Sequence, residues 1–265
     1  MMSQELVVNL NFWSKPPWSD GKGKYRLGLK PIEIEKWFEA EIDEELKQHK
    51  EKLFENSYES VVRATKDSME AQKLLTQHIA SNNKYRDPIA SMSLSVPDDL
   101  CIIESDGQQR LLAASVCSPS YWNLKEKIGE PLRVIHKPVK TLNEKIGNPI
   151  ERFISNAPVG TPFKRENWFI HGDSQRMHLE SEGFPKGDIS EWVIRSERET
   201  LCRYDEKYSL FAINVRFQKL SFINNFCEAK ESLKESLLKL DKDEIVYFGG
   251  QTKLDLILSY LESSE

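Results

Sequence analysis

The chain has 265 residues, with 37 Lys or Arg, 42 Asp or Glu, and a formal net charge of -5. This length is near the upper limit for one hydrophobic core, which favours a single domain over two equal halves. Because the chain has no block of basic residues to contact a phosphate backbone, we expect no nucleic-acid partner.

The amino-terminal run MMSQELVVNL has an acidic residue before its apolar residues and no basic segment, so it does not resemble a secretory signal. No apolar run approaches the roughly 20 residues that cross a bilayer. The cysteines form no Cys-x-x-Cys pair and are widely separated, at Cys101, Cys117, Cys202 and Cys227. We therefore expect a cytoplasmic protein with reduced thiols, no membrane association, and no disulfide, zinc or iron–sulfur site.

Residues 1–90 are predicted to form a mainly helical arm. Hydrophobic residues recur at helical spacing over residues 31–53, which predicts one long amphipathic helix. A second helix is expected from Asn56, because Glu59 completes a capping-box pattern. Asp87-Pro88 should end this helical region.

Residues 99–220 are predicted to form the sheet. Two short β-rich runs are joined through Asp106-Gly107, which indicates a hairpin. A second tight connection is expected at residues 204–207. Tight turns between neighbouring strands imply an antiparallel sheet. The expected strands are DLCIIES, RLLAASVCS, PLRVIHKPV, ENWFIHG, EWVIRSERETLCR and KYSLFAINVRF.

Helices are expected at residues 141–155, at 224–240 and at the end of the chain. In the first of these, Thr141 and Glu144 match a cap, and Pro149 is suited to a first helical turn. The fold class is therefore α+β: a single domain over residues 1–265, in which a helical arm, a curved antiparallel sheet and the carboxy-terminal helices of residues 224–265 follow one another.

His136 is the most informative of the five histidines. As a strand, PLRVIHKPV places the imidazole at the end of an apolar stripe with Leu132 and Val134. One interpretation is a core histidine bonded to a backbone carbonyl, and the other is a metal or haem ligand.

The other histidines carry weaker signals. His49 and His78 are expected at the boundary or surface of helices. His171 and His178, with Asp173 between them, match either a metal site or a surface loop.

The run RSERET places four charges in one predicted strand: Arg195, Glu197, Arg198 and Glu199. One interpretation is a cross-strand charge ladder on a solvated face. The other is a polar wall over a cofactor, which supplies charge to a substrate.

Four segments in fixed order resemble the haem-dependent oxidative N-demethylase family: YRLGLKPIEIEKWFEAE, PSYWNLKEKIGEPLRVIHKPV, KRENWFI and RSERETL. The resemblance spans about residues 25–220, and its most specific part is the Pro-Ser-x-Trp, Lys-Ile-Gly and Ile-His-x-Pro-Val series between residues 119 and 139. It implies a PAS-like fold, a b-type haem and a small secondary amine such as dimethylamine as substrate.

The resemblance also suggests roles for individual residues. His136 is the expected axial ligand of the haem iron. The expected partners of the haem propionates are Arg133, Lys137 and Arg165, and the residues expected on the other side of the haem are Arg198, Glu199 and Trp168. The chain departs from the family pattern after RSERETLCR, where a Leu-Pro turn is missing and Asn214 stands in place of an arginine.

The leading functional hypothesis is therefore a haem-dependent monooxygenase subunit. It would use O2 to oxidise an N-methyl group and release formaldehyde and the shorter amine. Because the chain has no dinucleotide fingerprint and no cluster-binding cysteines, the reductant is expected to bind elsewhere. The family resemblance implies that electrons from NADPH arrive through separate flavin and iron–sulfur reductase proteins. The alternatives are a haem-based gas or redox sensor and a haem-free small-molecule-binding protein on the same fold.

Overall fold

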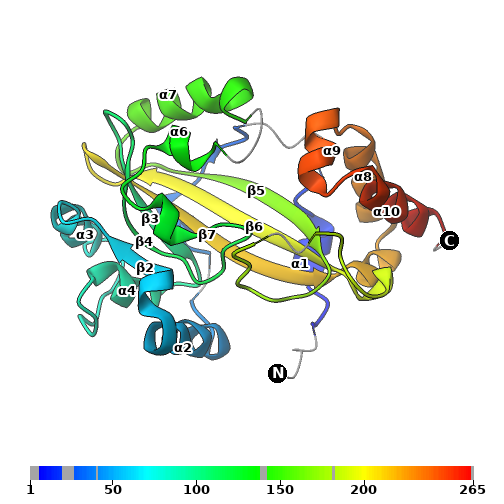
Figure 1. The fold of residues 1–265 in the computed structure, drawn as a ribbon, viewed down its shortest axis with the longest axis horizontal. Coiled ribbons are helices and arrows are strands. Elements are labelled where there is room, and N and C mark those ends of the chain that lie inside the picture. The colour runs from blue at the N-terminus through cyan, green and yellow to red at the C-terminus, as the bar shows by residue number, and fades with distance from the viewer. Residues whose placement is uncertain (1–5, 20–26, 40, 138–141, 181–182, 264–265) are drawn as a thin grey trace.

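A seven-stranded sheet runs through the centre of the molecule, with every neighbouring pair antiparallel, in the order β1-β5-β6-β7-β3-β4-β2 (Figure 1). The computed structural model describes residues 6–19, 27–39, 41–137, 142–180 and 183–263. The strands are β1 (Lys30–Pro31), β2 (Val62–Ala64), β3 (Asp99–Glu104), β4 (Leu111–Ser115), β5 (Pro162–His171), β6 (Val193–Arg203) and β7 (Tyr208–Lys219). The α+β class and the antiparallel sheet predicted from the sequence are confirmed.

Both predicted tight connections are present. The β3–β4 hairpin turns through Gly107, whose φ of 66° lies in the left-handed region that glycine enters at little cost. The β6–β7 hairpin turns at residues 204–207, where the Tyr204 N–H donates to the carbonyl of Tyr208 at 3.1 Å. These turns set the register of β3 with β4 and of β6 with β7.

Helices cover both faces of the sheet. Figure 1 shows α2, α3 and α4 near one end and α8, α9 and α10 near the other. The helices are α1 (Leu10–Ser14), η1 (Ile34–Lys36), α2 (Glu44–Val61), α3 (Met69–Leu75), α4 (Pro88–Ser93), α5 (Leu124–Lys127), α6 (Leu132–Ile135), η2 (Asn143–Gly147), α7 (Asn148–Asn156), η3 (Ile189–Glu191), η4 (Leu220–Asn225), α8 (Cys227–Leu238), α9 (Lys242–Phe248) and α10 (Gln251–Ser263).

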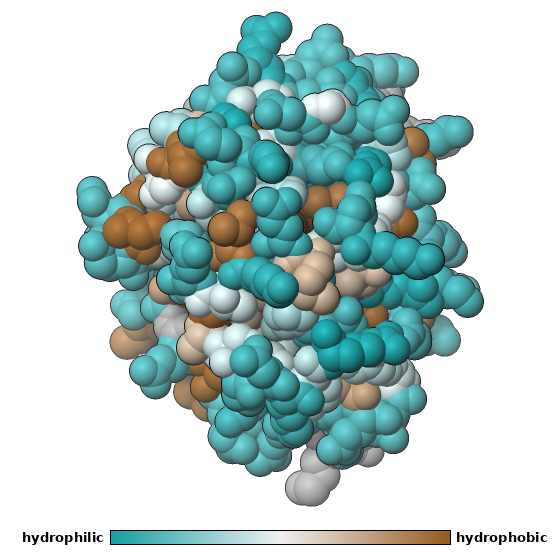
Figure 2. Space-filling view, turned by 90° about the vertical axis from the view of Figure 1, so that its left-hand side faces the viewer, coloured by the Kyte–Doolittle hydropathy of each residue, from teal (hydrophilic) through white to brown (hydrophobic). Residues whose placement is uncertain are grey.

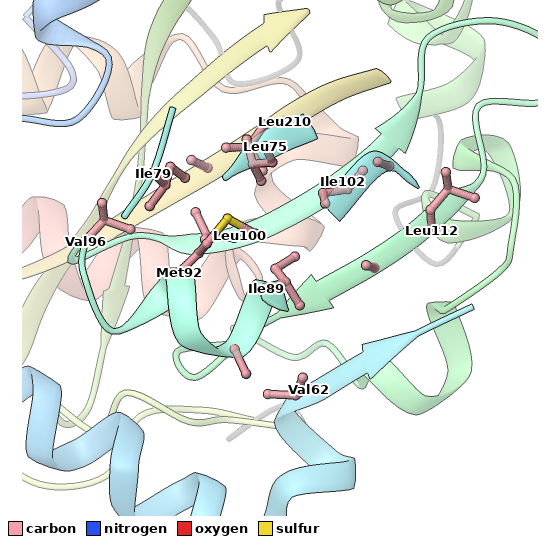
Figure 3. Close-up of a cluster of buried hydrophobic side chains, with 14 of the residues drawn as sticks. Val62, Leu75, Ile79, Ile89, Met92, Val96, Leu100, Ile102, Leu112 and Leu210 are labelled. Carbon is pink, nitrogen blue, oxygen red and sulfur yellow. The ribbon is translucent and has the colours of Figure 1, made fainter. Parts of the chain in front are cut away.

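The two faces of the sheet have different coverings. On the α6 face, Leu132 of α6 and Ile154 of α7 pack against Leu201 of β6. On the opposite side, the α2 face, α2, α3 and α4 pack over β3, β4 and β7 in the largest hydrophobic cluster (Figure 3). A second cluster on the α2 face joins α1, α8 and α10 to β5 and β6. Figure 2 views the side of the molecule where α3 lies and shows a mostly hydrophilic surface with small, separate hydrophobic groups.

The helix predicted over residues 31–53 is wrong in its first half. Residues 30–31 pair with β5, and η1 follows as a single turn. The helix begins only at Glu44, because the Asp43 carboxylate accepts the Leu46 N–H and caps it. Tertiary packing therefore overrides the helical spacing of the hydrophobic residues before Asp43.

The other boundaries predicted in residues 1–90 also shift. The break predicted near Asn56 is present, because Ser57 has a non-helical φ of -151° and ψ of 37° and divides α2 into two helical segments. The second segment is shorter than predicted and ends at Val61. Pro88 begins the short helix α4 instead of ending a helical region, since proline fits a first helical turn. Residues 62–64 form an edge strand of the sheet.

The strand predicted over PLRVIHKPV is wrong. Residues 132–135 form one helical turn, α6, and His136 is its C-cap. Leu132 and Ile135 are three residues apart and both buried, so a helical turn directs both side chains to the sheet. Pro138 and Val139 lie outside the described residues.

The helices expected after residue 140 are confirmed, although Thr141 lies outside the described residues. The turn η2 and helix α7 cover residues 143–156, and α8 and α10 match the two later predictions. Helix α9 was not predicted; it begins at Asp241, which forms a capping box with Glu244. In the part of the chain that the structure describes, no helix is long and apolar enough to cross a membrane.

A fully buried lysine fastens α2 to the chain entering β3. The Lys50 ammonium donates to the carbonyl of Ser93 at 2.8 Å, of Val96 at 3.1 Å and of Asp98 at 2.8 Å. Burial lowers the pKa of Lys50, and the negative charge of Asp99 opposes this effect. All three ammonium hydrogens are used, so the charge is retained inside the core.

Replacing Lys50 with methionine should therefore destabilise the protein. Lys50→Met leaves three buried carbonyls without a donor and removes the cation near Asp99, which should cost about 3 kcal/mol of unfolding free energy. Urea unfolding measures the change. The matched control is Lys52→Met, two residues away on the exposed side of α2, which should change stability by less than about 0.5 kcal/mol.

Candidate functional site

His136 lies on the α6 face, half-buried, directly after α6. Burial is the main cause that lowers the pKa of its imidazole to about 4, and the positive charge of Arg165 adds to this effect. The ring is therefore neutral at pH 7, the form that ligates a metal ion. Within the described residues, neither ring nitrogen has a hydrogen-bond partner.

An ion pair between neighbouring strands lies on the same face. Arg165 of β5 is in register with Glu199 of β6, and the Arg165 Nε donates to the Glu199 carboxylate. The Glu199 side chain is 5% exposed, and burial raises its pKa against the attraction of Arg165. The pKa of the Glu199 carboxyl group is therefore closer to neutral pH than the pKa of an exposed glutamate.

A second carboxylate on the α6 face is held from two sides. Glu197 accepts from Arg195 Nε at 3.0 Å and from Asn167 Nδ2 at 3.1 Å. The Arg195 guanidinium also donates to the carbonyls of Arg176, at 3.2 Å, and Ser118. Because these contacts come from β5, β6 and two loops, the Glu197 carboxylate is fixed in orientation.

The charges of RSERET do not form a solvated ladder. Arg195, Glu197 and Glu199 are buried on the α6 face, between β5 and β7, so the solvated interpretation is wrong. Arg198 points to the opposite, α2 face, where it donates to the carbonyl of Trp37 at 3.1 Å and to that of Lys36. Arg198 and Glu199 therefore cannot line one pocket together.

Trp168, a further expected site residue, and Asn214, which stands in place of the family's arginine, also lie on the α2 face. Trp168 packs edge-on against Trp18, with ring centroids 5.5 Å apart, and against Phe248, at 5.8 Å. Asn214 is in register with Arg198. The structure thus separates Trp168, Arg198 and Asn214 from His136, Arg165 and Glu199 by the thickness of the sheet.

Arg133 and Lys137 have different environments. The Arg133 guanidinium binds the Glu151 carboxylate and the Asn143 carbonyl, so it ties α6 to η2 and α7. A Cβ added at Gly147 would lie 2.5 Å from Arg133 Nη1, so a larger residue there would displace the Arg133 guanidinium. Lys137 is exposed beside His136.

The second histidine cluster is more buried than a surface loop would be. His171 ends β5 at 1% exposure, and its Nδ1 lies 3.2 Å from the Tyr121 hydroxyl. His178 lies 3.2 Å from Asp173, and the rings of His171 and His178 are 5.4 Å apart. Among the residues described, no group of three or more His, Cys, Asp or Glu side chains is placed to hold a metal ion.

Sequence reasoning named Glu199 and Arg165 as site residues, considered Arg195 and Glu197 only as part of a possible polar wall, and did not name Asn167. On the α6 face, Arg195 and Asn167 both donate to the Glu197 carboxylate. Strand alternation could have grouped these residues from the sequence, because residues 195, 197 and 199 share one face of a strand and residue 198 lies on the other. Contacts with the loops that carry Ser118 and Arg176 were not predictable from a local pattern.

The residues on the α6 face fall within the range of a known family. A family model described as haem-dependent oxidative N-demethylase, alpha subunit-like, matches residues 53–257, or 205 of the 265 residues. The matched range contains strands β2 to β7 and all the α6-face residues named above. No curated protein matches the chain.

The Arg165–Glu199 pair predicts a specific pattern of stability. Arg165→Met leaves Glu199 buried without this cation and should cost about 3 kcal/mol, whereas the double variant with Glu199→Leu should recover part of the loss. Urea unfolding of both single variants and the double variant gives the coupling energy. Arg110→Met, at a more exposed ion pair with Glu104, should cost no more than about 1 kcal/mol. Additive single effects would contradict a direct interaction.

Proposed function

The chain belongs to the haem-dependent oxidative N-demethylase, alpha subunit-like, family, and we propose that it is a haem-binding monooxygenase subunit. Its proposed reaction removes a methyl group from a small secondary amine such as dimethylamine, with O2 as oxidant and formaldehyde as a product. The observation that carries the proposal is a neutral imidazole, His136, on the same sheet face as the buried Arg165–Glu199 pair. We further propose that the sheet and its helices form a PAS-like fold.

The donor set on the α6 face fits a b-type haem. A haem iron needs a neutral axial imidazole, and its two propionates need cations nearby. His136 is the proposed axial imidazole. The proposed cations for the propionates are Arg165, which lies near His136, and the exposed Lys137. Arg133 binds Glu151, and we propose that it positions α6. When bound, the haem supplies the iron at which O2 is activated.

The carboxylates on this face fit an amine substrate. A secondary amine is protonated at neutral pH, and buried carboxylates attract an alkylammonium ion. Glu199, whose pKa is raised by burial, is suited to accept a proton from that ion. Glu197 is held by Arg195 and Asn167, so we propose that it orients the substrate.

The reductant is proposed to be a separate protein. The family name describes an alpha subunit, which indicates a multi-subunit oxygenase. The four cysteines form no disulfide, and within the described part of the chain no group of three or more His, Cys, Asp or Glu side chains is placed to hold a metal ion. We propose that electrons from NADPH arrive through flavin and iron–sulfur partners.

Changing the proposed axial ligand should abolish haem binding. His136→Ala should lose the Soret band of the purified, haem-reconstituted protein, because no other imidazole is proposed for the iron. Circular dichroism checks that the variant is folded. His78→Ala is the matched control, because His78 is exposed and contacts Trp37 on the α2 face, the face opposite to His136. This variant should keep the Soret band. An unchanged Soret band in His136→Ala would overturn this assignment and move the test to His171.

The rate of turnover should depend on the Glu199 carboxylate of the α6 face and not on Glu166, which lies on the α2 face. With dimethylamine, O2 and an added reductase or chemical reductant, Glu199→Gln should lower the rate of formaldehyde release about 100-fold while haem content is unchanged. Glu166→Gln is the control, because Glu166 pairs with Arg216 and is in register with Arg198. It should keep the wild-type rate within about twofold.

The same assay separates the alternative functions. NADPH alone should give negligible turnover with the isolated chain. Haem binding without formaldehyde release under any reductant would favour the sensor, and absence of a Soret band in the reconstituted wild type would favour a haem-free binding protein. Efficient NADPH-driven turnover without a second protein would contradict the proposed partner.

A further inference from the structure

The connection between β5 and β6 is much longer than the pairing of these strands requires. The two strands are adjacent and antiparallel, so a turn of roughly two to five residues would join them. The connection instead runs from residue 172 to residue 192, and its described part contains only the turn η3 and an isolated β-bridge. By comparison, residues 204–207 join β6 to β7. Long loops of this kind are usually lids or binding loops in compact domains.

The first part of the connection, residues 172–180, lies beside Glu197 on the α6 face. Arg195 Nε donates to the Glu197 carboxylate at 3.0 Å, and Arg195 Nη1 donates to the Arg176 carbonyl at 3.2 Å. One buried guanidinium thus contacts both the carboxylate and the loop. Along β6, the loop is attached at residue 195, the carboxylates follow at 197 and 199, and α6 and α7 pack at residue 201. The carboxylates therefore lie between two covers.

Backbone hydrogen bonds dock residues 172–180 onto a second loop. The Tyr121 N–H donates to the His178 carbonyl at 2.7 Å, and the His178 N–H donates to the Pro119 carbonyl at 2.9 Å. His178 and Ser120 are partners in the isolated β-bridge. The two loops are thus joined at one point, although they are far apart in the sequence.

The contacts that hold residues 172–180 are mainly polar. The Arg176 guanidinium donates to the Val215 carbonyl at 3.1 Å, which adds to the two backbone bonds and to the contact with Arg195. None of the residues 172–180 is buried, and within this segment only Met177 packs against a hydrophobic cluster. By contrast, α6 and α7 are held by hydrophobic packing. A segment with few buried apolar contacts opens at a lower free-energy cost than a packed helix.

We propose that residues 172–180 form a lid over the candidate site and that Arg195 holds this lid closed. Opening breaks the contact between Arg195 and the Arg176 carbonyl and gives a small alkylammonium ion access to Glu197. Closing restores the contact and excludes water from the carboxylates. The identity of the ion rests on the proposed function, whereas the lid rests on the contacts of Arg195 and His178.

Hydrogen–deuterium exchange of the full chain tests the lid without haem or turnover. Arg195→Lys keeps the charge but loses the forked geometry, so the amides of residues 172–180 should exchange about tenfold faster while those of α8 are unchanged. Arg203→Lys is the matched control, because Arg203 ends the same strand and donates to the carbonyls of Ser155 and Glu206. It should leave the exchange of residues 172–180 unchanged.

A second variant covers the case in which Arg195→Lys does not fold, as judged by circular dichroism. Arg176→Ala removes the side-chain contact with Val215 and leaves Arg195 and Glu197 in place. It should also increase the exchange rate of residues 172–180. Unchanged exchange of this segment in every folded variant would overturn the lid.

A reversible crosslink tests whether the lid must open during turnover. As β-bridge partners, Ser120 and His178 have Cα atoms about 4.8 Å apart, within the range of a disulfide. The double variant of Ser120→Cys and His178→Cys, oxidised with diamide, should keep its haem but release formaldehyde at least about tenfold more slowly than its reduced form. The wild type treated with diamide is the control and should keep its rate.

The crosslink also separates failure of the lid from failure of the proposed function. Equal rates for the oxidised and reduced double variant, with the disulfide confirmed by mass spectrometry, would overturn the lid and leave the proposed function in place. If the wild type binds no haem or shows no turnover, the proposed function fails, and the exchange result alone decides the lid.

Discussion

The structure depends on a charged strand that is buried in the middle of its sheet. Every residue of β6 from Val193 to Cys202 is buried, although four of them carry charge. Each charged side chain must therefore find a partner inside the protein, because an unpaired buried charge is costly. Strand alternation divides these charges between the two faces, and each face has a different chemistry as a result.

The partners of β6 explain how the surrounding elements are placed. On the α2 face, Arg198 holds the backbone around η1, and Lys50 holds the chain that enters β3. On the α6 face, Arg195 holds the loop of Ser118. These contacts join segments far apart in the sequence through charge-assisted hydrogen bonds, which are stronger than neutral ones.

The position of the candidate site follows from the division of the β6 charges between the two faces of the sheet. The α6 face combines buried carboxylates, a guanidinium and a neutral imidazole, and α6 itself supplies the imidazole through its C-cap. Arg133 fastens α6 to α7 through Glu151, so the position of His136 depends on helix packing as well as on the sheet. A perturbed histidine beside a buried ion pair is a physical reason to place function here.

The sequence by itself determined the α+β class, both hairpins, the long strands β5 to β7 and the family, because alternation, turn residues and ordered motifs are local signals. It also named Glu199, Arg165 and His136 as candidate site residues, and the structure places these three on one face of the sheet. Only the tertiary structure decided that residues 132–135 form the helical turn α6 and that no long helix forms before Asp43. It also decided that Trp168 and Arg198 lie on the face of the sheet opposite to Glu199. The physical reason is that a short apolar segment fits a helix or a strand equally well, and the surface on which it packs makes the choice.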